Sequence, residues 1–202
     1  MTGPDLSLER AARAGGALRV AGVDEVGRGP WAGPVTACAV ILRGPCPPGL
    51  DDSKKLSAKV RGAMEPWLRD VAWHGIGEAS VEEIDGMGIR RATHLAMARA
   101  VAALPVRPDL ALVDGSDRPD LPCAVRTVVK GDSVSLSIAA ASVVAKTWRD
   151  RGMVALAQRH PGYGWETNMG YGTAAHRLGL ERHGVTQHHR RSFAPIHNML
   201  RR

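Results

Sequence analysis

Two apolar segments separated by a glycine- and proline-rich turn lie near the start of the chain and most constrain its fold. Residues 18–26 (LRVAGVDEV) and 34–42 (PVTACAVIL) are apolar and rich in β-branched residues, and residues 27–33 (GRGPWAG) lie between them. Short apolar runs bounded by turn residues predict buried strands. We therefore predict that the two segments pair as a hairpin of a central sheet.

The remainder of the chain alternates between strand and helix patterns. Strands are predicted over residues 71–79, 110–114 and 125–129, and helices over residues 56–69, 89–103, 135–159 and 173–183. Ser80 and Glu83 have the spacing of a capping box, which predicts the start of a further short helix. Strands that come first and then alternate with helices favour an α/β fold with a mixed sheet flanked by helices.

Length and composition predict one domain in the cytoplasm. A chain of 202 residues is the size of a single domain, for which we expect residues 1–17 to be a flexible N-terminal extension and residues 18–202 the domain itself. No apolar run approaches the ~18–20 residues of a membrane span. The first 16 residues lack the apolar core of a signal peptide. The three cysteines form no CxxC pair, which argues against a zinc site or a disulfide framework.

The charge balance indicates a polyanionic partner. Lysine and arginine number 27 against 20 acidic residues, which gives a net charge of +7, and such an excess favours contacts to phosphates. Aromatic residues make up only 4% of the chain, so a stacking platform for single strands is not expected. The basic tail over residues 188–202, with the run His188–Arg191, is expected to be partly exposed as a solvated surface.

Four acidic residues stand where apolar strand segments end. They are Asp24 and Glu25 after VAGV, Asp114 after LALV, and Asp132 in VVKGD. A single aspartate in this position is more often a turn residue, but four such carboxylates brought together would repel one another without a counter-ion. All-oxygen ligands suit Mg²⁺ or Mn²⁺ rather than zinc. An acidic centre within a basic chain is the pattern of a metal-dependent phosphoryl-transfer enzyme that acts on nucleic acid.

Several motifs resemble those of ribonuclease HII, the bacterial type 2 ribonuclease H. They are AGVDEVGRGPWAGPV (residues 21–35), DSKKLS (52–57), KGDSVSLSIAAASVVAK (130–146), GYGTAAH (170–176) and HRRSFAP (189–195). They follow the order of the family from about residue 18 to residue 195. The resemblance implies a ribonuclease H-like α/β fold with a mixed five-stranded sheet and a C-terminal helical segment. It also implies an endonuclease that hydrolyses the RNA strand of RNA–DNA hybrids and incises 5′ to single ribonucleotides in duplex DNA. The expected mechanism is two-metal-ion hydrolysis of the phosphodiester, which leaves 5′-phosphate and 3′-hydroxyl ends.

The resemblance assigns expected roles to individual residues. Asp24, Glu25, Asp114 and Asp132 match the catalytic acids that hold divalent metal, Mg²⁺ or Mn²⁺. Gly27, Arg28 and Gly29, the GRG motif, match the residues that hold the junction between ribo- and deoxyribonucleotide. Tyr171 matches a tyrosine that packs against the sugar beyond that ribonucleotide, and Lys54, Ser142 and Lys146 lie in motifs that contact the nucleic-acid backbone. Ser116 stands where the family commonly has asparagine, for which we expect a small effect on the loop.

One further acid, Asp150, is not expected to join the metal site. In a continuous helix it would lie about 20 Å beyond the start of the helix that follows Asp132. We predict instead that Asp150 forms an ion pair with Lys146, four residues before it in the sequence, or supports the residues that hold the metal without contacting it.

Other functions remain open at this stage. A non-catalytic module that binds RNA–DNA hybrids would not need the four acids. Ribonuclease HIII resembles this fold but carries an additional N-terminal domain and GKG in place of GRG. Another fold relative, such as a resolvase or transposase, would not need to sense a 2′-hydroxyl. The partners expected are RNA–DNA hybrids and duplexes that contain ribonucleotides, with no membrane, for a protein that acts as a monomer.

Overall fold

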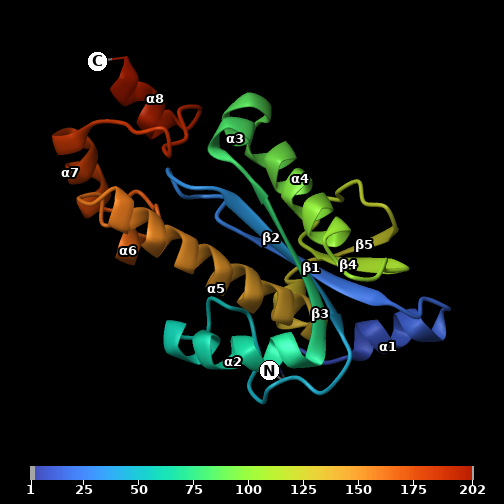
Figure 1. Cartoon of the computed structure of the whole chain (residues 1–202). Helices are drawn as coiled ribbons and strands as arrows, with labels where there is room; N and C mark the ends of the chain where they lie inside the picture. The colour runs from blue at the N-terminus through green and yellow to red at the C-terminus, as the bar shows by residue number, and fades with distance from the viewer. Residues whose placement is uncertain (1–2, 202) are drawn as a thin grey trace.

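A five-stranded mixed sheet forms the centre of the molecule in the computed structural model, which describes residues 3–201 (Figure 1). The strands are β1 (Val20–Val26), β2 (Val35–Leu42), β3 (Ala72–Ala79), β4 (Leu110–Asp114) and β5 (Ala124–Val128), in the order β3-β2-β1-β4-β5. β1, β2 and β3 pair antiparallel, whereas β4 pairs parallel with both β1 and β5. The predicted hairpin and mixed sheet are confirmed.

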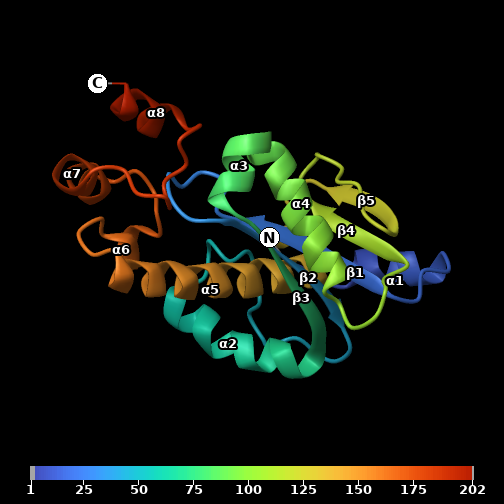
Figure 2. The same ribbon diagram turned by 45° about the horizontal axis from the view of Figure 1, so that its top comes forward.

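Helices cover both faces of this sheet (Figure 2). α3 (Val81–Met87) and α4 (Ile89–Ala102) lie on one face, while α5 (Leu136–Arg159) lies on the other and packs in turn against α2 (Ala58–Val71). Gly22 of β1 allows α5 to come close, because a Cβ at this position would lie 2.1 Å from the carbonyl carbon of Ser137. The start of α5 is therefore held directly against the central strand that carries Asp24.

The ends of the helices follow the signals in the sequence. Ser80 accepts a hydrogen bond from the backbone N–H of Glu83, and the Glu83 side chain accepts one from the Ser80 N–H, so the predicted capping box is present. Ser135 caps α5 by accepting from the N–H of Ile138. Each cap satisfies a backbone donor that has no partner within its own helix.

A C-terminal helical segment follows α5, as predicted. It comprises α6 (Trp165–Asn168), α7 (Ala174–His183) and α8 (Ala194–Leu200). These helices share an apolar cluster with the end of α5, in which Trp165, Leu180 and Ile196 are buried. The sequence did not predict α6, because a helix of four residues is too short to show a helical period.

The N-terminal residues are ordered where a flexible extension was expected. Residues 7–14 form α1 (Ser7–Ala14), and Glu9 on this helix is 1% exposed. One Glu9 oxygen accepts hydrogen bonds from the hydroxyls of Ser135 and Ser137 and from the Ser137 N–H. The carboxylate thus lies at the N-terminus of α5, where the helix dipole favours negative charge. The expectation for residues 1–2 falls outside the described residues.

No helix within residues 3–201 is long and apolar enough to cross a membrane.

Candidate active site

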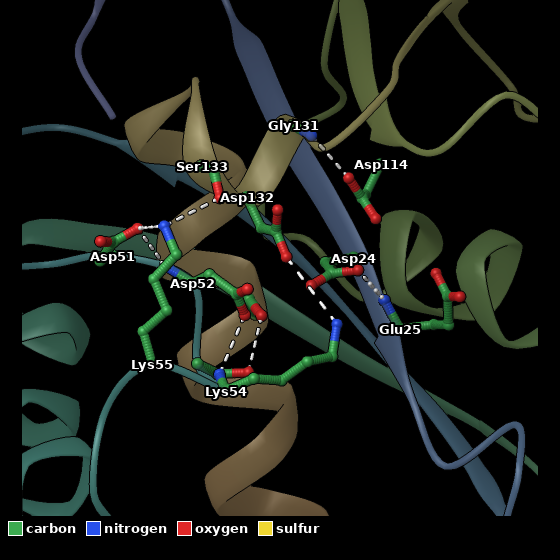
Figure 3. A network of polar contacts seen from close by, with 12 residues as sticks. Asp24, Glu25, Asp51, Asp52, Lys54, Lys55, Asp114, Gly131, Asp132 and Ser133 are labelled. Carbon is green, nitrogen blue, oxygen red and sulfur yellow. Dashed lines mark hydrogen bonds and ion pairs between the residues drawn. The ribbon is translucent and has the colours of Figure 1, made fainter. Parts of the chain in front are cut away.

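Sheet topology brings the predicted acids to one edge of the sheet (Figure 3). Val23 pairs with Val113 across the parallel strands β1 and β4, so Asp24 and Asp114 follow at the same end. Asp132 lies in the 3₁₀ turn η1 (Gly131–Ser133), which connects the region after β5 to α5. Three separate segments of the chain therefore contribute carboxylates to one place.

Backbone hydrogen bonds fix two of these carboxylates. Asp24 Oδ1 accepts from the N–H of Glu25 at 2.7 Å, and Asp114 Oδ1 accepts from the N–H of Gly131 at 2.7 Å. The second bond ties the end of β4 to the KGD turn and so places Asp132 beside the other acids. Lys130 adopts a left-handed conformation, φ 55°, which reverses the chain at this turn.

The pKa values of the acids indicate that the four carboxylates need a nearby positive charge to stay ionised together. Burial raises the pKa of Asp24 well above its usual range, and the negative charges of Glu25 and Asp114 raise it further. Burial also raises the pKa of Glu25, although the Arg28 guanidinium opposes this shift. The pKa of Asp132 is raised by burial and then by Asp114. Ionised carboxylates that are buried beside like charges need a counter-ion to remain charged.

Lys54 supplies part of that positive charge. Its Nζ atom lies 3.9 Å from Asp132 Oδ2, and its side chain is 80% exposed. Partial burial lowers the pKa of Lys54, but the charges of Asp52, Asp24, Asp132 and Asp114 outweigh this effect and raise it. The ammonium group is directed toward the carboxylates, as Figure 3 shows. Because the side chain is exposed and long, it can leave this position without disturbing the fold.

The oxygen ligands of the four acids suit a divalent cation. In this structure, however, their carboxylate groups are not close enough to one another to hold an ion together. Within residues 3–201, no three His, Cys, Asp or Glu side chains are arranged as a ready ligand set. Two of the carboxylates are occupied by protein cations, since Arg28 contacts Glu25 at 3.3 Å and Lys54 faces Asp132. The donor set is nevertheless all oxygen and carries up to four negative charges, which suits Mg²⁺ or Mn²⁺. A cation would take the place of these two contacts.

The GRG motif lies beside Tyr171. Gly27 has φ +90°, and a Cβ added to Gly29 would lie 3.3 Å from Cε1 of the Tyr171 ring. Tyr171 is 46% exposed. The N–H of Trp31 donates to the carbonyl of Gly170 at 2.8 Å, which joins the turn after β1 to the segment that carries the tyrosine. Motifs that are more than 140 residues apart therefore share one surface, and Arg28 of the GRG motif contacts Glu25 at 3.3 Å.

Residues 188–191 are not the solvated surface that the sequence suggested. His189 and Arg190 are both 0% exposed. Arg190 donates hydrogen bonds to the carbonyl oxygens of Gly27, Arg28, Gly33 and Pro34. Polar side chains of this kind can be buried because each donor finds an acceptor. The remaining members of the run are half-buried His188 and exposed Arg191.

His189 belongs to a hydrogen-bonded chain that ends at Tyr171. The Thr186 N–H donates to Nδ1 of His189 at 3.0 Å, and the Nε2 atoms of His189 and His176 are 3.1 Å apart. His176 Nδ1 lies 3.0 Å from the carbonyl oxygen of Tyr171, to which it must donate. These partners assign neutral tautomers to both rings, and the lone pair of His176 Nε2 is shared by the N–H at His189 Nε2 and the indole N–H of Trp165, each at 3.1 Å.

We predict that acid destabilises the protein through this histidine pair. Burial lowers the pKa of His176; burial, and then repulsion between the two rings if both were protonated, lowers the pKa of His189 to about 3. A histidine whose pKa is depressed on folding stabilises the protein above its unfolded pKa of about 6.5, and this stability is lost as the pH falls. The free energy of unfolding should decrease by on the order of 2 kcal/mol between pH 7 and pH 5.

Urea unfolding at several pH values measures this effect. His189→Gln, which replaces the ring with a neutral amide, should flatten the dependence, while His197→Gln at an exposed position should leave it unchanged. A pH dependence of the same size in wild type and His189→Gln would contradict the prediction.

The other predicted substrate residues, Ser142 and Lys146, both lie on α5 and hydrogen-bond to side chains of the protein itself. The Ser142 hydroxyl is buried and donates to Ser53 Oγ at 2.9 Å, so it supports the loop that carries Lys54. Lys146 Nζ donates to Asp150 at 2.8 Å. Asp150 also pairs with Arg61 at 3.3 Å, and the predicted Lys146–Asp150 ion pair is confirmed.

Two cavities differ in their relation to the acids. One of about 300 Å³ is lined by Glu25, Arg28, Asp114 and Ser116. The other, of about 870 Å³, lies between α3, α5 and residues 187–188 and contains none of the four carboxylates. The smaller cavity is therefore the one that belongs to the site, and it includes the serine that stands where asparagine was expected.

The fold and the carboxylates at the edge of the sheet define an α/β protein of the ribonuclease H-like class. The ribonuclease H2 of Pyrococcus horikoshii superposes with a TM-score of 0.75 at 23% identity, over 90% of this chain and 97% of that one. A crystal structure of Bst-RNase HIII in complex with Mn²⁺ gives 0.74 at 22% identity, over 95% of this chain and 72% of that one.

The family follows from sequence. The model of the family Ribonuclease HII matches residues 21–196. A ribonuclease HII of Paracoccus denitrificans is 60% identical over 99% of this chain and 96% of its own length, and one of Ruegeria pomeroyi is 59% identical over 99% and 86%. The chain therefore belongs to the ribonuclease HII family, whose members are endoribonucleases that depend on divalent metal.

Proposed function

We propose that this protein hydrolyses the RNA strand of RNA–DNA hybrids and incises 5′ to single ribonucleotides in duplex DNA. The products are a 5′-phosphate on the ribonucleotide and a 3′-hydroxyl upstream. The observation that carries the proposal is the placement of Tyr171 against Gly29, in the same turn as Arg28, which contacts the Glu25 carboxylate at 3.3 Å. The Tyr171 ring and the GRG motif would contact the sugar, and the carboxylates would hold the metal. This combination suits cleavage at a position chosen by a ribose.

The four carboxylates of Asp24, Glu25, Asp114 and Asp132 would hold the divalent metal. Metal bound there supplies an activated water and stabilises the leaving 3′ oxygen of an in-line displacement. The chain itself holds the acids in position through the hydrogen bonds of Asp24 to Glu25 and of Asp114 to Gly131. Because burial alone disfavours the ionised acids, cation binding and ionisation are coupled at this site.

The GRG motif would recognise the ribonucleotide. Gly27 has a positive φ, and a Cβ there would lie 2.2 Å from Nε of Arg149; at Gly29 a Cβ would make a tight contact of 3.3 Å with the Tyr171 ring. A backbone without side chains can approach a sugar closely. The 2′-hydroxyl is both a donor and an acceptor and distinguishes RNA from DNA at one position.

Lys54 and Lys146 would contact the phosphate backbone, for which we predict a measurable change in salt dependence. Replacing either lysine by alanine removes one phosphate contact and should reduce the slope of log K against log salt by about 0.9 on a B-form duplex. Fluorescence anisotropy with a labelled hybrid at several salt concentrations provides the measurement. Lys59→Ala, at an exposed position on α2, is the matched control. Unchanged slopes in both variants would place these lysines away from the nucleic acid.

The proposed activity is tested with duplexes that carry zero, one or many ribonucleotides. We expect incision of the second and third in Mg²⁺ or Mn²⁺, no incision of the first, and no product in EDTA. Mapping the ends of the product from the second duplex decides the position of the cut. A cut 3′ to the ribonucleotide, or equal cleavage of the all-DNA duplex, would overturn the proposal.

A further inference from the structure

Arg190 lies directly beneath the GRG motif and contacts its backbone. The guanidinium donates from Nη2 to the carbonyl of Gly27 at 2.6 Å and from Nη1 to the carbonyl of Arg28 at 3.0 Å. Nε and Nη2 donate to the carbonyl of Gly33 at 3.0 and 2.8 Å, at the other end of the same turn. No carboxylate within residues 3–201 lies within ion-pair distance of this fully buried guanidinium. Every side-chain hydrogen bond that Arg190 makes within residues 3–201 is to a backbone carbonyl of residues 27–34, and the guanidinium also lies over the Phe193 ring.

These two carbonyls belong to the peptide groups whose amides face the proposed substrate. The Gly27 carbonyl shares a peptide plane with the N–H of Arg28, and the Arg28 carbonyl shares one with the N–H of Gly29. In a planar trans peptide the C=O and N–H bonds point in opposite directions. A guanidinium that holds both carbonyls inward therefore directs both amides outward. Arg28 and Gly29 are exposed, and neither amide donates a hydrogen bond to another residue within 3–201.

We propose that Arg190 is a positioning residue for ribonucleotide recognition, because it fixes the two GRG peptide groups so that their amides are presented together to the 2′-hydroxyl. The inference rests on the proposed function. The fork of the guanidinium suits this task, since its donors lie in one plane at a fixed separation, whereas a lysine ammonium has no such geometry. A buried positive charge behind the carbonyls also polarises the peptide groups and strengthens their outward N–H donors.

A second buried arginine holds the neighbouring part of the same surface. Arg149 of α5 donates to the carbonyls of Ala32 and Pro34 in the turn and to the carbonyl of Met169, two residues before Tyr171. It thereby joins the GRG turn to the segment that carries the tyrosine. Arg190 sets the direction of the two amides, and Arg149 sets the distance between the turn and Tyr171.

The test compares recognition of ribose with recognition of phosphate in one assay. The variant is Arg190→Lys, and the matched control is Arg61→Lys, because Arg61 is also buried and donates to two backbone carbonyls, those of Ser53 and Leu56. The substrate is a duplex with one ribonucleotide in Mg²⁺, which gives KM. The competitor is the same duplex in all-DNA form, which gives an inhibition constant that reports phosphate contacts alone.

For Arg190→Lys we expect KM to rise about tenfold, as for the loss of one to two hydrogen bonds, while the inhibition constant of the all-DNA duplex stays within twofold. Arg61→Lys should leave the ratio of the two constants unchanged. If Arg190→Lys is not folded by circular dichroism, Arg190→Gln replaces it, because a carboxamide can still donate to one of the two carbonyls.

The outcomes separate the inference from the function on which it rests. A wild-type protein that does not incise the ribonucleotide duplex overturns the proposed function and this inference with it. A wild type that incises this duplex, together with an Arg190 variant that keeps the wild-type ratio or raises both constants equally, overturns only the role of Arg190.

Discussion

Replacing Asp24 or Asp114 by asparagine is expected to reduce the cleavage rate at least about a thousandfold, which corresponds to about 4 kcal/mol of activation free energy. Asparagine keeps the size of the side chain but removes a negative charge from the set that would hold the metal. Affinity for an RNA–DNA hybrid should change by no more than about threefold, because binding comes chiefly from lysine and arginine contacts to phosphate. Single-turnover cleavage in Mg²⁺ and anisotropy binding measure the two quantities.

Stability distinguishes a lost metal ligand from a damaged fold. Burial, and then the charges of Glu25 and Asp114, raise the pKa of Asp24, so neutralising this residue removes a buried charge and relieves repulsion in the metal-free protein. We therefore expect the thermal midpoint of Asp24→Asn without metal to equal or exceed that of the wild type. Asp70→Asn, at an exposed position on α2, controls for the substitution itself. Cleavage by Asp24→Asn or Asp114→Asn near the wild-type rate would show that these acids are not the metal site.

The strands and their terminal acids could be predicted because local chemistry determines them. The segments that become β1 and β4 are continuous apolar runs, and the parallel pairing of Val23 with Val113 brings Asp24 and Asp114 to the same edge. The capping box at Ser80 and the ion pair between Lys146 and Asp150 depend on residues three or four apart, so they are also visible in the sequence.

Buried polar residues could not be predicted in the same way, because their partners are distant in the chain. In the sequence, Arg190 has the pattern of an exposed cation. In the structure it is buried, because it donates to backbone carbonyls that lie 156 to 163 residues earlier in the chain. Glu9 lies in the segment that was expected to be a flexible extension. Its carboxylate is held by the hydroxyls of Ser135 and Ser137, which are more than 120 residues later in the sequence. The HRRSF run was the one available signal for Arg190, and it gave no indication of burial.

The sequence predicts four carboxylates that together hold a metal ion. The structure brings these residues to one edge of the sheet but does not bring their carboxylates into contact around a common point. Two of the four acids, Glu25 and Asp132, already face the side-chain cations of Arg28 and Lys54. Four clustered carboxylates require a nearby positive charge, but the sequence does not show whether a metal ion or a side chain of the protein provides it. The protein meets part of that requirement with its own exposed side chains, which can move when metal and phosphate bind.

Removing the ring of Tyr171 is expected to impair incision at a single ribonucleotide much more than cleavage of a long hybrid. The ring lies against Gly29 and is half exposed, so it can pack on the sugar that follows the ribonucleotide. A 2′-hydroxyl on that sugar would crowd the ring, which favours a deoxyribose there. Loss of aromatic packing costs about 1–3 kcal/mol, so kcat/KM of Tyr171→Ala on the single-ribonucleotide duplex should fall by about fivefold to 150-fold.

Tyr171→Phe separates the ring from its hydroxyl and should retain activity on both substrates, since packing on a sugar needs only the ring face. The backbone of residue 171 stays fixed in both variants, because its carbonyl accepts from His176 and from the N–H of Thr173 independently of the side chain. The decisive quantity is therefore the ratio of kcat/KM on the two substrates. If Tyr171→Ala lowers both values by the same factor, the tyrosine supports the turn without reading the junction. Selection of the deoxyribose would then have to come from another part of the surface around Gly29.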